Sequence, residues 1–120
     1  MLTFPHFEPH FPRAQWTLPQ VLEHQARERA ERPFLSWTDA GPALSYAQVN
    51  ARVNQLAHGM AAFGIQRREH VGILLPNCLE FLFAWFALNK LGAVEVAISD
   101  AYKGSFLAHP LQLSQARTLI

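Results

Sequence analysis

Residues 71–81 read Val-Gly-Ile-Leu-Leu-Pro-Asn-Cys-Leu-Glu-Phe, and this stretch decides the fold. Its first five residues form a continuous apolar run that Pro76 ends, which is typical of a strand buried on both faces. Asn77-Cys-Leu-Glu80 then has the spacing of a capping box and opens a helix that Gly92 closes. Residues 94–98 form the next apolar run. A strand, a helix and a second strand in this order predict a βαβ unit, and therefore a parallel sheet.

Two further helices are expected on the N-terminal side of this unit. Thr17-Leu-Pro-Gln20 has capping-box spacing with proline in the first turn, and Pro33 stops the helix that follows. Ser45-Tyr-Ala-Gln48 is a second such spacing, and Gly64 stands where a left-handed helix end is expected. Apolar residues recur in this second helix at steps of four and three, which predicts one stripe facing the core: Val49, Val53, Leu56, Met60 and Phe63.

The other segments complete an alternation of strands and helices. They are expected in this order: short strands near 34–37 and 43–44 around a turn at 39–42, a loop at 99–104, a helix near 105–113 disturbed by Pro110, and a strand from 117 to 120. This alternation predicts the α/β class, with a parallel sheet and helices on both of its faces. Residues 1–16 are rich in Pro, Phe and His and lack periodicity, so we expect an extended N-terminal arm before a folded part at residues 17–120.

The helix expected at residues 78–91 is apolar on almost every side. Only Glu80, Asn89 and Lys90 interrupt its apolar residues. A helix of this kind needs burial all round, and each large side chain left in water forfeits about 1.5–3 kcal/mol. A sheet of three or four parallel strands with three or four helices can cover one side of it, and the strand from residue 117 is shorter than usual. We therefore expect an incomplete part of a larger α/β domain, with this helix exposed on one side. A self-contained domain that dimerises through the helix is the alternative.

Composition excludes several classes of protein. The 120 residues are 50% hydrophobic and 16% charged, as in a folded domain, and the formal charge of +1 gives no basic field for nucleic acid or anionic lipid. Cys78 is the only cysteine, so an internal disulfide cannot form. The longest apolar stretch, residues 81–88, is far shorter than the roughly 20 residues of a membrane span, and the N-terminus lacks a signal-peptide pattern. We expect a soluble, cytoplasmic protein without a transmembrane segment.

Two sets of candidate motifs have simpler structural explanations. Residues 59–64 match the glycine spacing of a P-loop, but Ile65-Gln66 replace its Lys and Ser/Thr, and the glycines fall at a helix end. No Gly-x-Gly-x-x-Gly fingerprint occurs. The histidines are scattered without the spacing of a zinc site, which favours surface or cap positions for all six: His6, His10, His24, His58, His70 and His109.

A few side chains could still be reactive. Cys78 lies in the first turn of a helix, where the dipole can lower a thiol pKa, although a small apolar filler is the simpler interpretation. Ser45 is explained by capping, and neither Ser45 nor Ser105 stands in a Gly-x-Ser-x-Gly elbow. Tyr102 and Lys103 follow a predicted strand, and open α/β sheets bind ligands beyond the carboxyl ends of their strands. That loop is a candidate binding position, with a solvated connection as the alternative. These residues predict no catalytic constellation and no metal site.

Four segments in order resemble the adenylate-forming enzymes, a family of acyl-CoA synthetases, adenylation domains and luciferases. Leu44-Ser-Tyr-Ala-Gln-Val-Asn50 is similar to the first core motif, Leu-Thr/Ser-Tyr-x-Glu-Leu-Asn. Residues 71–81 are similar to a strand-to-helix passage with Pro-Asn-x-x-Glu-Phe, and residues 57–65 to Ala-x-x-Leu-x-x-Leu-Gly-Val. Residues 88–98 are similar to the second core motif, Leu-x-Lys-x-Gly-Ala-x-x-Val-Pro-Ile/Leu. The resemblance extends over about residues 17–120.

Within this family, residues 77–86 look closest to the carnitine/crotonobetaine-CoA ligase branch. The sequence also departs from the family pattern. Ala97 stands where proline is preferred, Ser99-Asp100 where Asn-Pro is common, and His109-Pro110 interrupts a helix that the family keeps regular. These departures concern the loop after the strand, and with it any acyl or CoA contact of that loop.

The resemblance implies an N-terminal piece of the large subdomain of an ATP-dependent acyl-CoA ligase. Such an enzyme converts a carboxylic acid, ATP and CoA to acyl-CoA, AMP and pyrophosphate, assisted by Mg²⁺, in fatty acid or carnitine metabolism. The family's phosphate loop, its ribose-binding aspartate and its catalytic lysine do not map onto residues 1–120. The resemblance therefore implies no catalytic residue here, no cofactor bound by this chain alone, and no activity alone. The alternative is a non-catalytic α/β interaction module that docks or self-associates through the apolar helix at residues 78–91.

Overall fold

A three-stranded parallel sheet lies at the centre of the protein. The computed structural model describes residues 12–38 and 41–120. Strands β3 (His70–Ile73), β4 (Val94–Ala97) and β5 (Thr118–Leu119) lie in the order β4-β3-β5, and β3 pairs in parallel with both neighbours. The apolar run that decides the fold in the sequence is therefore the central strand of the sheet.

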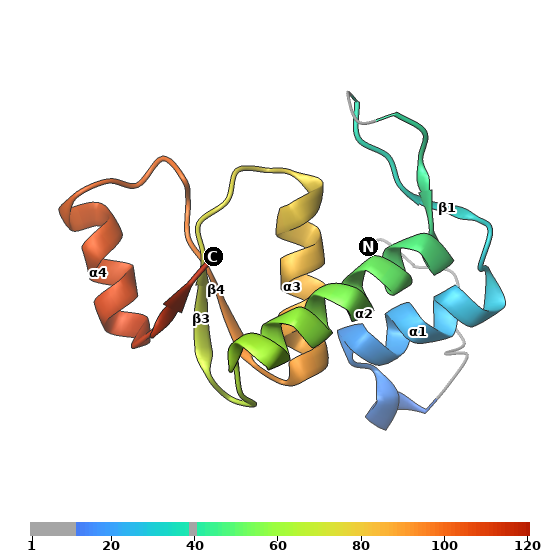
Figure 1. Ribbon diagram of the computed structural model, residues 1–120, viewed down its shortest axis with the longest axis horizontal. Helices are drawn as coiled ribbons and strands as arrows, with labels where there is room; N and C mark the ends of the chain where they lie inside the picture. The colour runs from blue at the N-terminus through green and yellow to red at the C-terminus, as the bar shows by residue number, and fades with distance from the viewer. Residues whose placement is uncertain (1–11, 39–40) are drawn as a thin grey trace, which may run out of the picture.

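Helices cover both faces of this sheet. Figure 1 shows α2 (Tyr46–Phe63) and α3 (Leu79–Leu91) on one side of the strands and α4 (Ser105–Ser114) on the other. The helix α3 connects β3 to β4, and α4 leads from β4 across to β5. The two crossovers run in opposite directions along the sheet, so right-handed connections place their helices on opposite faces. The predicted α/β class, with a parallel sheet between helices, is confirmed.

A small antiparallel pair stands apart from the main sheet. Strands β1 (Pro33–Leu35) and β2 (Leu44–Ser45) pair with each other, as the two predicted short strands. The aromatic rings of Phe34 and Tyr46 stack with their centroids 4.4 Å apart, which fixes the pair against the start of α2. Residues 39–40 of the predicted turn lie outside the described residues.

The N-terminal region differs in part from the prediction. The described part of the predicted arm contains a 3₁₀ turn, η1 (Arg13–Gln15), so an extended conformation is wrong at these residues. Residues 1–11 of that arm lie outside the described residues. The first α-helix, α1 (Leu18–Glu28), follows as expected and ends before Pro33.

One of the three predicted capping boxes is present. The backbone N–H of Ser45 donates to Gln48 Oε1 (2.9 Å), and the Gln48 N–H donates to Ser45 Oγ (3.2 Å). The predicted box at Thr17 is wrong, since its side chain makes no cap hydrogen bond, and Pro19 removes one of the N–H donors that it could accept. The predicted box before α3 is also wrong, because the N-cap there is Cys78, whose thiol is a weak acceptor.

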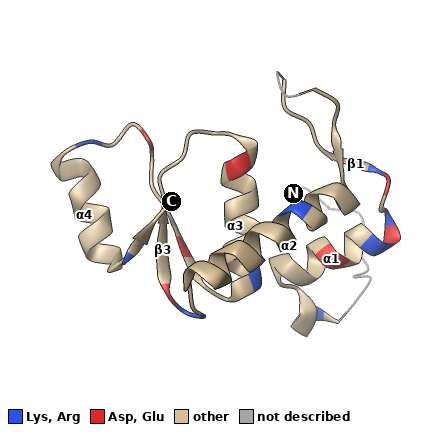
Figure 2. Ribbon diagram, in the orientation of Figure 1, with Lys and Arg blue, Asp and Glu red and all other residues tan. Residues whose placement is uncertain are grey.

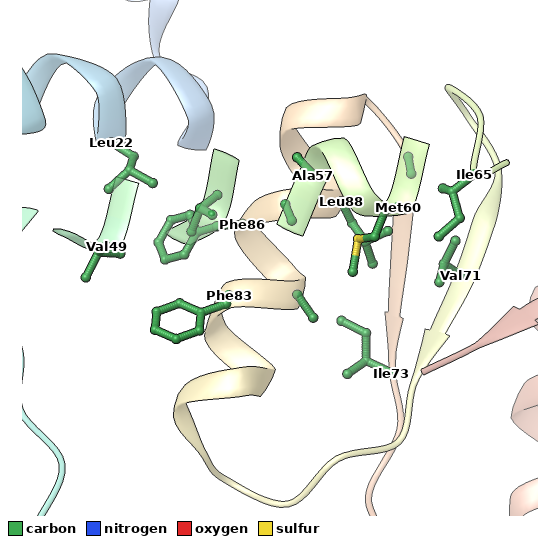
Figure 3. Close-up of a cluster of buried hydrophobic side chains, with 14 residues drawn as sticks. Leu22, Val49, Ala57, Met60, Ile65, Val71, Ile73, Phe83, Phe86 and Leu88 are labelled. Carbon is green, nitrogen blue, oxygen red and sulfur yellow. The ribbon is translucent and has the colours of Figure 1, made fainter. Parts of the chain in front are cut away.

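The core lies between α1, α2, α3 and one face of the sheet. Val71 and Ile73 of β3 are fully buried, and Figure 3 shows them in one cluster with Met60 and Leu88. The residue between them, Gly72, faces α4. A Cβ atom there would lie 2.7 Å from Leu119 Cδ1 and 3.5 Å from Leu111 Cδ2. The other buried apolar residues of the cluster are Leu22, Val49, Val53, Ala57, Ile65, Phe83, Ala84, Phe86, Ala87 and Ala93.

The predicted stripe of α2 is correct except at its end. Val49, Val53 and Met60 are buried and Leu56 is half-buried, but Phe63 is 79% exposed. Ala57, which the prediction left out, is buried instead. Successive residues turn by about 100° around a helix, so Phe63 lies on the side of the stripe away from Ala57 and rotates out of the core.

The prediction that one side of α3 lies in water is wrong. Glu80 is the only exposed residue between Leu79 and Leu91, and the apolar side chains of the helix are buried or half-buried. Both α1 and α2 pack against α3 together with β3 and β4, so the sheet and helices that were expected to cover one side of this helix cover most of its surface. The most exposed large apolar side chains belong to other elements: Phe63, Phe106 and Leu113.

Candidate functional site

The loops at the carboxyl ends of β3 and β4 form the edge at which open parallel sheets bind ligands. In the loop after β4, the Tyr102 N–H donates to the Ser99 carbonyl (3.0 Å), and the Ala101 N–H donates to Ser99 Oγ (3.3 Å). Tyr102 is 47% exposed and Lys103 is also exposed, and neither side chain bonds to another described residue. The structure thus places both residues at the predicted edge but assembles no polar site around them.

A buried polar cluster connects the three helices on the core side. Lys90 Nζ, at the end of α3, contacts Glu23 Oε1 of α1 at 2.7 Å and Asn50 Oδ1 of α2 at 2.8 Å. The Lys90 side chain is 9% exposed and that of Glu23 is 44% exposed, so the ammonium is buried while the carboxylate reaches water. The carboxylate of Glu23 and the amide oxygen of Asn50 both accept a hydrogen bond from the buried ammonium group and so compensate for its lost hydration. These two bonds fix the packing of the three helices.

A second polar contact joins α3 to β4. Trp85 Nε1 donates to Glu95 Oε1 (2.8 Å), and Asn89 Nδ2 donates to the carbonyl of Trp85 (2.9 Å). Asn50 and Lys90 come from the two core motifs, so these motifs meet in space and serve the packing of the fold. The sequence analysis missed this meeting because 40 positions separate the two residues. The available signal was that Lys90 and Asn89 are the polar exceptions at the end of an apolar helix.

The other sequence candidates have structural roles or remain apart. Ser45 is 7% exposed and its hydroxyl oxygen caps α2, as predicted, while Ser105 is exposed at the start of α4. Cys78 is half-buried at the N-cap of α3. The predicted helix end at residues 59–64 is confirmed, since Gly64 closes α2 with φ 112°.

The histidines of residues 12–38 and 41–120 do not gather into a site. Nδ1 of His70 bonds to the Ser114 carbonyl oxygen, which joins β3 to the end of α4. His58 and His109 are exposed, whereas His6 and His10 lie outside the described residues. Within the described part of the chain, no three His, Cys, Asp or Glu side chains are close enough together to hold a metal ion.

The described residues do not form a nucleotide site at the carboxyl edge. Asp100 and Lys103 are the charged residues of the loop after β4, and both are exposed. Four hollows of 270–540 Å³ occur on the described surface, and none of these four is lined by residues 99–104. The residues present at this edge therefore do not fit ATP or Mg²⁺. Among the described helices, none has both the length and the apolar character that a membrane crossing requires.

Comparison with known proteins gives one consistent result. A family model described as AMP-binding enzyme matches residues 22–120. The crotonobetaine/carnitine–CoA ligases of Salmonella paratyphi B and Salmonella typhimurium are 40% identical to this chain over 77 residues, which are 64% of this chain and 15% of each ligase.

Solved structures show the same likeness. The N-terminal domain of FACL13 from Mycobacterium tuberculosis superposes with a TM-score of 0.81 at 26% identity, over 86% of this chain and 26% of that one. The N-terminal subdomain of NpsA from Klebsiella oxytoca also has a TM-score of 0.81, at 20% identity, over 87% of this chain and 27% of that one, and shows the fold alone. This chain thus spans 15% of the length of the similar ligases.

Proposed function

The chain belongs to the family of AMP-binding enzymes, and from that membership we propose that it is the N-terminal part of the large α/β subdomain of an ATP-dependent acyl-CoA ligase. The resemblance to adenylate-forming enzymes that the motifs indicated is confirmed. The observation that carries the proposal is the 40% identity to crotonobetaine/carnitine–CoA ligases over 77 residues.

The proposed reaction of the complete enzyme has two steps. A carboxylate attacks ATP to give an acyl-adenylate and pyrophosphate, and the CoA thiol then displaces AMP. Mg²⁺ would stabilise the negative charge of the phosphates. The similar ligases suggest crotonobetaine or carnitine as the carboxylic acid. We propose that the enzyme is cytoplasmic. ATP is implied by the family itself.

The role of the described residues in this proposal is structural. The contacts of Lys90 with Glu23 and Asn50 hold three helices together, and the Trp85–Glu95 bond holds α3 against β4. This packing holds the helices together and against the sheet, whose carboxyl edge carries the loops from which a ligase would reach its substrates. Because no described group at that edge fits ATP, we propose that the 120 residues are inactive alone.

A chimera tests the proposal. The matching N-terminal segment of the Salmonella typhimurium crotonobetaine/carnitine–CoA ligase is replaced with this chain, and CoA ligation is measured with crotonobetaine and with carnitine. The proposal expects a folded chimera that retains ligase activity. A control chimera carries Lys90→Met, which should lower its melting temperature. A chimera that folds with the native melting temperature yet ligates neither acid would contradict the proposed function.

The alternative from the sequence is an interaction module that docks through the helix at residues 78–91, and most of this helix is covered within the chain. The helix α3 presents only Glu80 as an exposed residue and is packed against α1 and α2. What stays accessible on this helix is a mainly apolar hollow of about 460 Å³, which Phe83 and Ala84 line together with residues of α2. Self-association through other exposed apolar residues, such as Phe106 and Leu113 of α4, stays a prediction.

A further inference from the structure

A basic hollow lies at the amino edge of the sheet, opposite the loops that would serve the ligase reaction. Its volume is about 540 Å³, and its charged lining residues are Arg67, Arg68, Glu69, His70 and Arg117. This volume lies within the range of roughly 300–1,000 Å³ that is usual for small-molecule sites. The turn before β3 and the turn before β5 bring these residues together from two parts of the chain.

The lining of this hollow carries a net positive charge. Three guanidinium groups face one carboxylate, so the lining carries a formal charge of +2 when His70 is neutral, whereas the whole chain carries +1. Figure 2 shows these basic positions at the turns that lead into β3 and β5. Among the described residues the only ion pair joins Lys90 to Glu23, so Arg67, Arg68 and Arg117 lack an ion-pair partner there.

The single carboxylate of the hollow is occupied by other bonds. Glu69 Oε2 accepts from the Gln66 N–H (3.0 Å), and Glu69 Oε1 accepts from Thr118 Oγ1 (2.9 Å). These bonds tie the turn before β3 to β5, which brings the pair Arg67 and Arg68 close to Arg117. Glu69 therefore organises the basic groups without a direct ion pair to them, although the charge of Arg117 helps to lower the pKa of its carboxyl.

The backbone at the hollow is strained. Arg68 (φ 66°) and Gln115 (φ 56°) are the two described residues other than glycine with positive φ, and both line this hollow. Gln115 is the left-handed residue that ends α4, as is common at helix ends, so the strained turn is the one that carries Arg68. A left-handed backbone costs a residue with a side chain about 1–2 kcal/mol. Such outliers cluster at ligand sites, where the surrounding structure holds them. Here the Arg68 N–H donates to the Gly92 carbonyl (2.8 Å), which keeps the arginine in the turn.

We propose that this hollow binds a phosphate-bearing anion of small-molecule size, such as pyrophosphate or the phosphate chain of a nucleotide. Arginine presents a planar fork of N–H donors that matches phosphate oxygens, and its charge persists at every physiological pH. The arginines without a direct ion pair, the hollow that they line and the strained turn that carries Arg68 coincide at one place. Because this place lies at the amino edge, it is an accessory site separate from the edge expected to hold the adenylate.

Titration of the full 120-residue chain tests the proposal. Sodium pyrophosphate and ADP are added at constant ionic strength, with sodium acetate as the anion control, and backbone amide shifts are followed by NMR. The site predicts saturable shifts at residues 66–70 and 115–118 with pyrophosphate. ADP binding with equal strength would indicate a nucleotide site, and pyrophosphate binding alone would indicate an inorganic polyphosphate site.

Two substitutions separate binding from folding. Arg68→Gly removes a guanidinium and relieves the left-handed strain, so it should weaken pyrophosphate binding about tenfold while keeping or raising the melting temperature. Arg27→Gln removes the same charge from an exposed position on α1 outside the hollow and should leave binding unchanged within about twofold. The proposal is overturned if the shifts do not saturate, if acetate produces the same shifts, or if both substitutions weaken binding equally.

Discussion

Lys90→Met should destabilise the protein because it removes the bonds that connect α3 to α1 and α2. Lys90 is 9% exposed at its side chain and bonds to Glu23 at 2.7 Å and to Asn50 at 2.8 Å. Methionine keeps most of the volume of the side chain, so the loss is mainly that of the polar contacts. A hydrogen bond to a charged group contributes about 1.5–3 kcal/mol. Because the Glu23 side chain is 44% exposed, water replaces its lost partner, and we expect a net loss of about 2 kcal/mol.

Urea unfolding followed by circular dichroism measures this loss. For a domain of this size, about 2 kcal/mol corresponds to a fall in melting temperature of roughly 6–12 °C. Lys103→Met is the matched control, because Lys103 is exposed and should change the free energy of unfolding by less than about 0.5 kcal/mol. A cycle with Glu23→Gln isolates the coupling of the pair. If Lys90→Met and Lys103→Met have the same small effect, the buried cluster does not stabilise the packing of the helices.

Four other substitutions test further parts of the structure. Ser45→Ala should lower the free energy of unfolding by about 1 kcal/mol because it removes the cap of α2, and an unchanged urea midpoint would contradict that role. Phe83→Ala should lower the free energy of unfolding by about 3–5 kcal/mol, because Phe83 is only 9% exposed. Phe63→Ala should lower it by less than about 0.5 kcal/mol, because Phe63 is 79% exposed. Equal losses in thermal melts would refute the burial of Phe83 and the exposure of Phe63. Hydrogen bonds from the backbone N–H of Gln66 and then from the Thr118 hydroxyl lower the pKa of the Glu69 carboxyl below its ordinary value of 4.5. The ionised carboxylate therefore stabilises the folded state fully above pH 4.5, and this stabilisation disappears as the pH falls through the lowered pKa. Glu69→Gln should therefore lower the melting temperature at pH 7 and lose this difference in acid, and a difference that persists at the lowest pH would contradict the assignment.

Local patterns in the sequence predict much of the fold. The apolar run that contains Val71 and Ile73 became the central strand, because a strand with neighbours on both sides and helices on both faces has no solvated side. Ser45 and Gln48 formed their capping box, and Gly64 and Gly92 closed their helices with left-handed backbones. These features depend on residues within a few positions of one another, which is why one sequence suffices to find them.

Contacts between distant residues could not be predicted in the same way. The burial of α3 depends on how α1 and α2 pack across it, and the composition of the helix alone does not indicate this packing. Lys90 meets Glu23 over a separation of 67 positions, and Glu69 meets Thr118 over 49 positions. The hollow with Arg67, Arg68 and Arg117 forms where β5 pairs with β3, a pairing that this second contact supports, so no local motif indicates it.

We propose that these 120 residues are a structural part of a ligase and do not activate a carboxylic acid by themselves. Carboxylate-dependent exchange of pyrophosphate with ATP, measured on the isolated 120-residue chain, tests this most directly. Crotonobetaine and carnitine are the acids to supply, with Mg²⁺ present, and the active chimera serves as the positive control. Exchange at the rate of the protein-free blank is the expected result. Exchange that depends on the acid and on the amount of chain would show that these residues form an ATP site, and would contradict the account.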